Sequence, residues 1–383
     1  MNHLKFSYSL LEKLPSVTFI RGHAGNLELT VKSTVDNIEV FVLGVMKNAG
    51  CSDNNAKEVA TVIALAESFG VHGHGLNKLG QYFKAVKSGK CDGKATPEVV
   101  KENKTCILIN GKNAPGPTIG TFAMAQALKK ALEVGICVAA TYDCTDLLMP
   151  SKYVLDVINN QCLGAVFSNN SPTMAPSGSS QVAIGSNPFS FGAPGKNGDY
   201  YLLNGNCTKA DMGKIEFWDK IGKPIPQGWA ITKDRKPETS AKKVMESPHL
   251  LGVGETVTQV AFKSYGMGVA FEILAGCLTG AAVGPEHKKY GDSSRKDNFG
   301  ATFICIDPNV FTIGYLERMQ LFLDTLRKNS PIGKTAVLIP GDLERKHRKL
   351  ALKDGVLLHQ KIVDHCNEVA KEASATPLNV TKV

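Results

Sequence analysis

The stretch TFAMAQALKKALEVGICVAATY, residues 121–142, changes its hydrophobic period part-way along. In its first part apolar residues recur every three or four positions, which predicts an amphipathic helix. The predicted apolar face consists of Phe122, Ala125, Leu128 and Leu132. In its last part the run ICVAATY is apolar and of strand length. A helix followed at once by an apolar strand is typical of an α/β fold.

The same alternation continues on both sides of this stretch. Strands are predicted at KTCILING (104–111), LGAVFS (163–168) and ATFICIDP (301–308), and a helix capped by Ser151 at SKYVLDVINN (151–160). Apolar strands between helices indicate a largely buried sheet. Because no strand is followed by G-x-G-x-x-G opening a helix, a Rossmann crevice is not expected.

Both ends of the chain carry helical patterns. The predicted helices are 37–50, 52–68 and 77–89 near the N-terminus and 316–328, 342–355 and 359–373 near the C-terminus. The predicted N-caps are Ser52 and Asp342, and the predicted helix ends are Gly50 and Gly355. We therefore predict a mixed α/β (α+β) fold whose parts are a helical domain formed by 34–90 and 310–383, a central α/β domain at 91–309, and an N-terminal extension at 1–33.

Charge and hydropathy exclude several classes of protein. The 383 residues carry a formal net charge of +9, which favours an anionic ligand such as a nucleotide, a carboxylate or a phosphate. The densest basic run, 344–353, is predicted to be a solvated helix face, so no nucleic-acid partner is expected. Residues 265–284 are long and apolar, but Glu272 interrupts them, which predicts a buried helix and no membrane partner.

The cysteines and the N-terminus indicate the compartment. Ten cysteines are scattered without any CxxC spacing, a pattern typical of reduced thiols in a cytosol-like compartment. The N-terminal segment has few basic residues and contains Glu12, so it is a poor transit peptide. We predict a cytoplasmic protein, with mitochondrial import as the alternative.

The segment SFGVHGHGLNKLGQYF, residues 68–83, frames His72 and His74 with glycines and places Lys78 four residues after His74. Glycine lets the backbone approach a ligand closely, and histidine suits proton transfer near neutral pH. Spacing alone leaves the two histidines as structural residues, as an acid/base group or as metal ligands. No metal site is expected, because no further histidine, cysteine or aspartate set accompanies them at ligand spacing. Lys78 is either solvated or clamps a carboxylate.

From about Val35 to residue 373 the chain resembles the malate/L-lactate dehydrogenase family, which lacks a Rossmann fold and includes ureidoglycolate, sulfolactate and 2,3-diketogulonate oxidoreductases. The matching stretches follow the family's order: GVHGHGLNKL (70–79), SNNSPTMAPSGS (168–179), IGSNPFSF (184–191), GKPIPQGWAI (222–231), FKSYGMGVAFEILAGCLTGAAVG (262–284), NFGATFICIDPNVF (298–311) and IPGDLER (339–345). The resemblance implies a non-Rossmann fold whose central domain binds NAD or NADP. It also implies a homodimer that interconverts a small malate- or lactate-like 2-hydroxy acid and its 2-oxo acid.

Particular residues acquire roles from this resemblance. It implies that His74 transfers the proton and that Lys78, in place of a family arginine, contacts the substrate carboxylate. Asp146, within DCTDLL at 143–148, stands where the family has another histidine and is a further catalytic candidate. The implied cofactor-binding positions are Asn170, Asn204, Gly205, Asn206, Cys207, Thr208, Lys209, Ala210, Phe262, Lys263, Gly341 and Asp342.

Several polar positions of the family pattern are changed. Phe69 replaces an arginine, Gly73 replaces a serine, and Asn204 replaces an acid. The apolar motifs of the family are kept while these polar positions differ. Two hypotheses about the function of the protein follow. One is an NAD(P)-dependent 2-hydroxy-acid oxidoreductase with a shifted substrate. The other is a paralogue with reduced or lost catalysis that binds a nucleotide or a partner protein.

Overall fold

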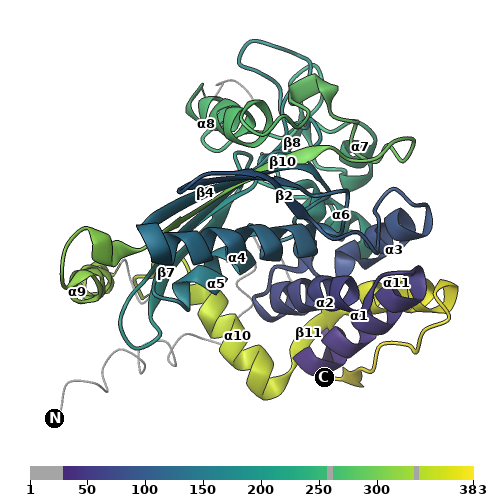
Figure 1. The fold of residues 1–383 in the computed structure, drawn as a ribbon. Coiled ribbons are helices and arrows are strands. Elements are labelled where there is room, and N and C mark those ends of the chain that lie inside the picture. The colour runs from purple at the N-terminus through teal and green to yellow at the C-terminus, as the bar shows by residue number, and fades with distance from the viewer. Residues whose placement is uncertain (1–28, 257–261, 332–335) are drawn as a thin grey trace.

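A mixed seven-stranded sheet forms the centre of the molecule (Figure 1). The computed structural model describes residues 29–256, 262–331 and 336–383. The strands, in their order across the sheet, are β2 (Glu98–Glu102), β3 (Cys106–Asn110), β4 (Ile136–Cys144), β10 (Phe299–Ile306), β5 (Leu163–Ser168), β6 (Phe189–Pro194) and β7 (Tyr200–Gly205). Only β3 and β4 pair in parallel, and the other neighbours are antiparallel. The strands predicted at 104–111, 136–142, 163–168 and 301–308 are confirmed.

Helices cover both faces of this sheet. Helices α4 (Gly116–Val134) and α5 (Pro150–Ile158) pack on one face, and α8 (Phe262–Glu272) lies on the other (Figure 1). The apolar face predicted for α4 is wrong in part, because Ala125 and Leu132 are exposed, while Phe122 and Leu128 are half-buried against the core. The buried residues of α4 include Ala123, Met124, Ala127 and Ala131. These mostly small side chains let α4 lie close to the strands, while Leu132 turns to solvent.

The two ends of the chain meet beside a second, small sheet. Strand β1 (Leu29–Ser33) pairs with both β11 (Val356–His359) and β12 (Thr381–Lys382). Around this sheet lie α1 (Val35–Ala49), α2 (Asp53–Ser68), α3 (Leu79–Lys87), α10 (Asp342–Asp354) and α11 (Gln360–Glu372) (Figure 1). Strand β1 falls inside the predicted extension 1–33, of which residues 1–28 lie outside the described part of the chain. The division into domains stays a prediction.

Helix ends were predicted from capping residues with mixed success. Ser52 accepts a hydrogen bond from the Asn55 N–H (3.3 Å), and Gly50 ends α1 in the left-handed conformation at φ 113°, both as expected. Asp342 is not the N-cap of α10, because Gly341 takes that position. Ser151 likewise lies inside α5, which begins at Pro150.

The remaining elements link the sheet to the helices. Residues 206–211 lead from β7 into α6 (Met212–Ile221), which contacts both α11 and the short 3₁₀ helix η2 (His72–His74). A second 3₁₀ turn, η3 (Leu76–Lys78), follows η2. The small strands β8 (Ala230–Ile231) and β9 (Pro237–Glu238) precede α7 (Ala241–Glu246). Helix α9 (Tyr315–Arg327) follows β10 and lies toward one edge of the molecule (Figure 1).

Residues 265–284 do not form a buried helix. They continue α8 to Glu272 and then form the π-helical turn Ile273–Cys277. One side of α8 packs on the cluster of Met174, Ile184 and Cys207, but the opposite side is open, with Phe262 73% exposed. Within the described residues, no helix combines the length and apolarity needed to cross a membrane. All ten cysteines are free thiols, and eight of them are buried.

Candidate active site

A backbone contact between two glycines positions the histidine turn. Gly73 in η2 lies directly against Gly213 in α6, and a Cβ atom on Gly213 would collide with the Gly73 carbonyl oxygen. The Asn77 side chain reinforces the contact by donating to the Gly213 carbonyl at 3.0 Å. Because neither residue has a side chain, the turn lies on the first turn of α6 with nothing between them.

This contact brings His74 beside Asp211. His74 Nε2 lies 3.6 Å from Asp211 Oδ2, and Asn206 donates to the same oxygen at 3.3 Å. The other carboxylate oxygen, Oδ1, accepts from the Lys214 N–H at 2.8 Å and caps α6. Burial alone would raise the pKa of Asp211, but the His74 ring and Lys214 lower it below its usual range, so Asp211 is ionised.

The two ring nitrogens of His74 have different environments. The ring is largely buried, and its Nδ1 has no hydrogen-bond partner within the described residues. A buried nitrogen without a partner is costly unless something binds it. With Nε2 turned to Asp211 and Nδ1 turned elsewhere, His74 has the arrangement of an oriented acid/base group.

His72 has a different environment. Its Nδ1 lies 2.5 Å from Glu67 Oε2, and its ring stacks on Phe217 at 5.7 Å between centroids. The second oxygen of Glu67 accepts the Leu76 N–H at 2.7 Å, so this carboxylate also holds the turn between η2 and η3. Burial lowers the pKa of His72, but the charge of Glu67 and the hydrogen bond to it outweigh burial, and the pKa is raised.

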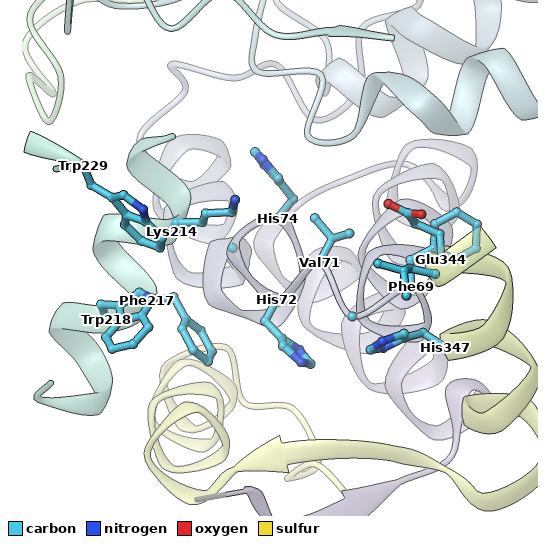
Figure 2. Close-up of a pocket in the computed structure, with 13 residues that line it drawn as sticks. Phe69, Val71, His72, His74, Lys214, Phe217, Trp218, Trp229, Glu344 and His347 are labelled. Atoms are coloured by element: carbon cyan, nitrogen blue, oxygen red, sulfur yellow. The ribbon is translucent and has the colours of Figure 1, made fainter. Parts of the chain in front are cut away.

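A small cavity opens beside both histidines (Figure 2). Its volume is about 40 Å³, which is room for roughly three water molecules. Lys214 is the one lysine among the lining residues, which include no arginine, and its Nζ lies 5.7 Å from the ring centre of Trp229. The lining residues are Phe69, Gly70, Val71, His72, Gly73, His74, Lys214, Phe217, Trp218, Trp229, Leu343, Glu344 and His347.

Lys78 points into an internal ion pair instead. The residue is only 3% exposed, and its Nζ lies 2.8 Å from Glu216 Oε2 and 3.1 Å from the Tyr290 hydroxyl. Gln81 and Tyr290 donate to the other oxygen of Glu216. Burial opposes the charge on Lys78, but Glu216, Tyr290 and Asp146 raise its pKa overall. Lys78 is not one of the residues that line the cavity.

Asp146 is also outside the cavity lining. Its carboxylate accepts the Leu148 N–H at 2.9 Å, and its backbone carbonyl accepts the Tyr82 hydroxyl. The structure therefore brings His74 to the cavity but places the other two catalytic candidates away from it.

The predicted cofactor-binding residues gather around β7, although they come from four separate parts of the sequence. Asn204 and Gly205 end β7, and 206–210 continue toward Asp211. Asn170 donates to the Ser186 hydroxyl at 3.0 Å, and the Ser186 carbonyl accepts the Cys207 N–H at 2.8 Å.

Helices α8 and α10 complete this grouping. Phe262 and Lys263 are exposed at the start of α8, whose Tyr265 and Val269 pack on the cluster that contains Cys207. Next to Gly341, Pro340 accepts the Leu202 N–H of β7 at 3.0 Å.

Asp342 is engaged within the protein. Its carboxylate pairs with Arg327 at 2.7 Å and with Arg345 at 2.6 Å, and it also accepts the Ile339 N–H. Asp199 bonds to the same two arginines. This network of ion pairs connects α9, α10 and the start of β7. Asp342 therefore has a structural role in this network.

Sequence reasoning missed the partner of His74 and three residues of the cavity lining. Asp211, which lies beside His74, and the lining residues Lys214, Phe217 and Trp218 lie in ADMGKIEFWDK, 210–220, directly after the segment assigned to the cofactor. What identifies these residues is the approach of α6 to the histidine turn, which requires the small residue Gly213. This approach is a tertiary contact, and no periodicity in the sequence reveals it.

The chain belongs to the malate/L-lactate dehydrogenase family, whose sequence profile matches residues 33–367. It is 28% identical to L-sulfolactate dehydrogenase from Methanocaldococcus jannaschii over 342 residues, covering 88% of this chain and 96% of that protein. It is 26% identical to malate dehydrogenase from Pyrococcus abyssi over 358 residues, covering 91% and 97%. The dehydrogenases of this family use NAD or NADP.

The fold agrees with this membership. The crystal structure of malate dehydrogenase from Entamoeba histolytica superposes with a TM-score of 0.85 at 22% identity, covering 91% of this chain and 99% of that one. The predicted family and the mixed α/β fold are thus confirmed.

The ion pair of Lys78 and Glu216 predicts a large loss of stability when one partner is removed. Lys78→Met is expected to lower the free energy of unfolding by about 3–5 kcal/mol, because it leaves Glu216 charged and buried. The double variant Lys78→Met/Glu216→Leu is expected to recover most of that loss. Urea unfolding of the three proteins measures both effects, and equal losses in the single and double variants would contradict the ion pair.

The raised pKa of His72 predicts a pH-dependent term in stability. Because the folded pKa lies above the unfolded value, this contribution is complete below about pH 6.5 and is lost as the pH rises through the folded pKa. Each unit between the two pKa values corresponds to about 1.4 kcal/mol. The free energies of unfolding of wild type and His72→Asn should therefore converge as the pH rises from 6. A constant difference between the two proteins over this range would contradict the prediction.

Proposed function

We propose that this protein is an NAD(P)-dependent oxidoreductase that interconverts a small 2-hydroxy acid and its 2-oxo acid, with His74 as the acid/base group. The observation that carries the proposal is the environment of the two ring nitrogens of His74. Its Nε2 faces an ionised Asp211, while its buried Nδ1 has no hydrogen-bond partner among the described residues. Nδ1 is thus the atom from which a proton can reach a substrate.

In the reducing direction, a bound NAD(P)H supplies the hydride that C2 of the oxo acid accepts. His74 gives its Nδ1 proton to the keto oxygen, which becomes the hydroxyl of the product, and it takes that proton back in the reverse reaction. Asp211 holds the ring in place and stabilises the positive charge of the protonated imidazole.

We assign the contact with the substrate carboxylate to Lys214. It lines the cavity and lies on the first turn of α6, next to Asp211. The role implied for Lys78 stays a prediction, and its ion pair with Glu216 argues against it because a substrate would have to displace a buried carboxylate. The role of Asp146 also stays a prediction.

For the cofactor we propose the surface along β7. Residues Asn204–Ala210, Asn170 and the starts of α8 and α10 surround it, and the segment ends at Asp211 beside His74. A cofactor held there by Phe262, Lys263, Gly341 and Asp342 would end near the acid/base group. The cavity itself is too small for a nucleotide.

We further propose a homodimer built through α8. Its open side is an apolar stripe of Phe262, Met267, Ile273 and Leu278, with Lys263 as the one charged residue among its exposed positions. Contiguous apolar surface of this kind is typical of a protein interface. A second copy of the chain would bury it.

The alternative function is a family member that binds a nucleotide or a partner protein without turnover. The ion pair of Lys78 and Glu216 favours it, since the lysine in the family's arginine position is already neutralised. The two functions differ in one measurement, which is the oxidation of reduced cofactor by a 2-oxo acid.

Substitution of His74 tests the proposed chemistry. The wild type should oxidise NADH or NADPH when a 2-oxo acid is added, and His74→Asn should lower kcat by about 10²–10⁴-fold because the proton donor is lost. Cofactor binding should persist, measured as energy transfer from the two tryptophans, Trp218 and Trp229, to the reduced nicotinamide. Asp211→Asn keeps the helix cap but removes the charge beside His74. It should therefore lower kcat less than His74→Asn does and shift the pH dependence of kcat.

The matched control is His365→Asn, a histidine on α11 outside the cavity lining, which should keep wild-type kcat. Wild-type protein that binds the cofactor but reduces no 2-oxo acid would support the alternative function. Unchanged kcat in His74→Asn would remove His74 from the mechanism.

The α8 interface predicts a defined effect on oligomeric state. Wild type should have twice the chain mass of 41.1 kDa in light scattering, and Ile273→Glu should give monomers because it buries a charge in the interface. Val40 on α1 is 68% exposed, and Val40→Glu is the matched control that should remain dimeric. Monomeric wild type, or dimeric Ile273→Glu, would contradict the interface.

A further inference from the structure

A buried carboxylate away from the cavity joins three segments that are far apart in the sequence. Glu272, the last residue of α8, is 6% exposed, and its Oε1 accepts the side-chain amide of Asn187 at 3.0 Å. Its Oε2 accepts the Asn169 amide at 3.1 Å and the Gly284 N–H at 3.3 Å. One side chain thus holds α8 to the segment between β5 and β6 and to the segment that follows the π-helical turn.

Glu272 is charged in this position. Burial alone would raise the pKa of its carboxyl group, but His287 and the amides of Asn187 and Asn169 lower it below its usual range. The Nε2 atom of His287, itself a buried residue, lies 3.9 Å from Glu272 Oε2. An ionised carboxylate only accepts hydrogen bonds, and the three groups bonded to this one are all N–H donors. A neutral amide here would set its own NH2 group against one of those donors.

The bond to Asn187 holds an uncommon backbone conformation. Asn187 is fully buried and has φ 44°, in the left-handed region. Besides Glu272, its amide donates to the Gly268 carbonyl at 2.9 Å, so both bonds of this amide go to α8. The left-handed turn at Asn187 is therefore fixed by α8.

The turn at Asn187 leads directly to the proposed cofactor surface. The preceding residue, Ser186, accepts from the Asn170 side chain through its hydroxyl and from the Cys207 N–H through its carbonyl. The Asn187 N–H donates to the Asn170 side chain at 3.4 Å. Both parts of that surface, the segment after β7 and the start of α8, are thus connected through Glu272.

This surface suits an anionic cofactor. Lys209, half-buried, and Lys263, exposed, bring two positive charges to it, as the diphosphate of NAD or NADP requires. The segments that carry the two lysines adjoin each other. Thr208 forms a β-bridge with Gly252, and Ser264 of α8 lies directly against Gly252.

We propose, building on the proposed function, that Glu272 is a positioning residue for the nicotinamide cofactor. It acts through Asn187: the carboxylate holds the left-handed turn, and the turn holds Ser186 and Asn170 beside the segment after β7. A group that shapes a binding surface without meeting the reacting atoms changes the affinity for the cofactor and leaves the chemical step at His74 unchanged.

Energy transfer from the two tryptophans to NADH or NADPH measures cofactor binding by the full-length protein without turnover. Glu272→Gln is expected to raise the cofactor Kd by about 10–100-fold, since a displacement of about 1 Å is enough for a loss of this size. Its kcat at saturating cofactor should stay within about 3-fold of wild type. Glu286→Gln, the same change at an exposed position, is the matched control that should keep the wild-type Kd.

Two further variants separate positioning from loss of stability. Asn187→Gly removes the amide without straining the left-handed backbone, so it should raise the Kd by a similar factor, and it carries the test alone if Glu272→Gln does not fold. The double variant should bind no more weakly than the weaker single variant, because two residues that act as one unit give non-additive losses. Val42→Ala, which leaves a cavity in the buried core beside α1, should lower Tm without changing the Kd.

The outcomes separate this inference from the proposed function. Unchanged Kd in Glu272→Gln and Asn187→Gly, additive losses in the double variant, a raised Kd in Val42→Ala, or wild type that binds neither cofactor would overturn the inference. If the Kd values follow the expected pattern but no 2-oxo acid is reduced, the positioning role stands and the proposed function fails. If wild type reduces a 2-oxo acid and neither substitution changes the Kd, the function stands and the positioning role fails.

Discussion

The contact between the backbones of Gly73 and Gly213 is the constraint on which the site depends. It joins the histidine turn, which belongs to the helices at the chain ends, to α6, which continues from the central sheet. No side chain separates the two, so the position of His74 relative to Asp211 is set by main-chain atoms. Main-chain contacts of this kind hold a site more firmly than side chains that can change rotamer.

Helix α6 also explains the environment of Lys78. Glu216 lies two residues after Lys214 and directly before Phe217, outside the cavity lining, and its carboxylate pairs with Lys78. A lysine in place of an arginine loses the planar fork that grips a carboxylate, and here it becomes part of the protein interior. Lys214, two residues before Glu216, lines the cavity.

Sequence patterns predicted what depends on neighbours along the chain. The start of α2 at Ser52 and the end of α1 at Gly50 follow from local hydrogen bonds, and both are confirmed. The outward turn of Leu132 and the open side of α8 depend on which surfaces meet in three dimensions, and periodicity does not contain that information. Asp342 was predicted to be an N-cap because aspartate is common at that position, but its carboxylate forms ion pairs with Arg327 and Arg345.

The same distinction applies to the site. His74 was singled out in the sequence because glycines frame it and because the family pattern marks it, whereas no sequence pattern singled out Asp211. Only the approach of α6 to η2 shows that this carboxylate lies beside the imidazole.

The lining of the cavity draws on separate parts of the molecule. His74 and Asp211 are held by the glycine contact, while Phe69, at the end of α2, and Glu344 and His347, on α10, line the cavity from other elements. Because the glycine contact uses main-chain atoms alone, the side chains on α2 and α10 can differ while the contact that places His74 beside Asp211 stays the same.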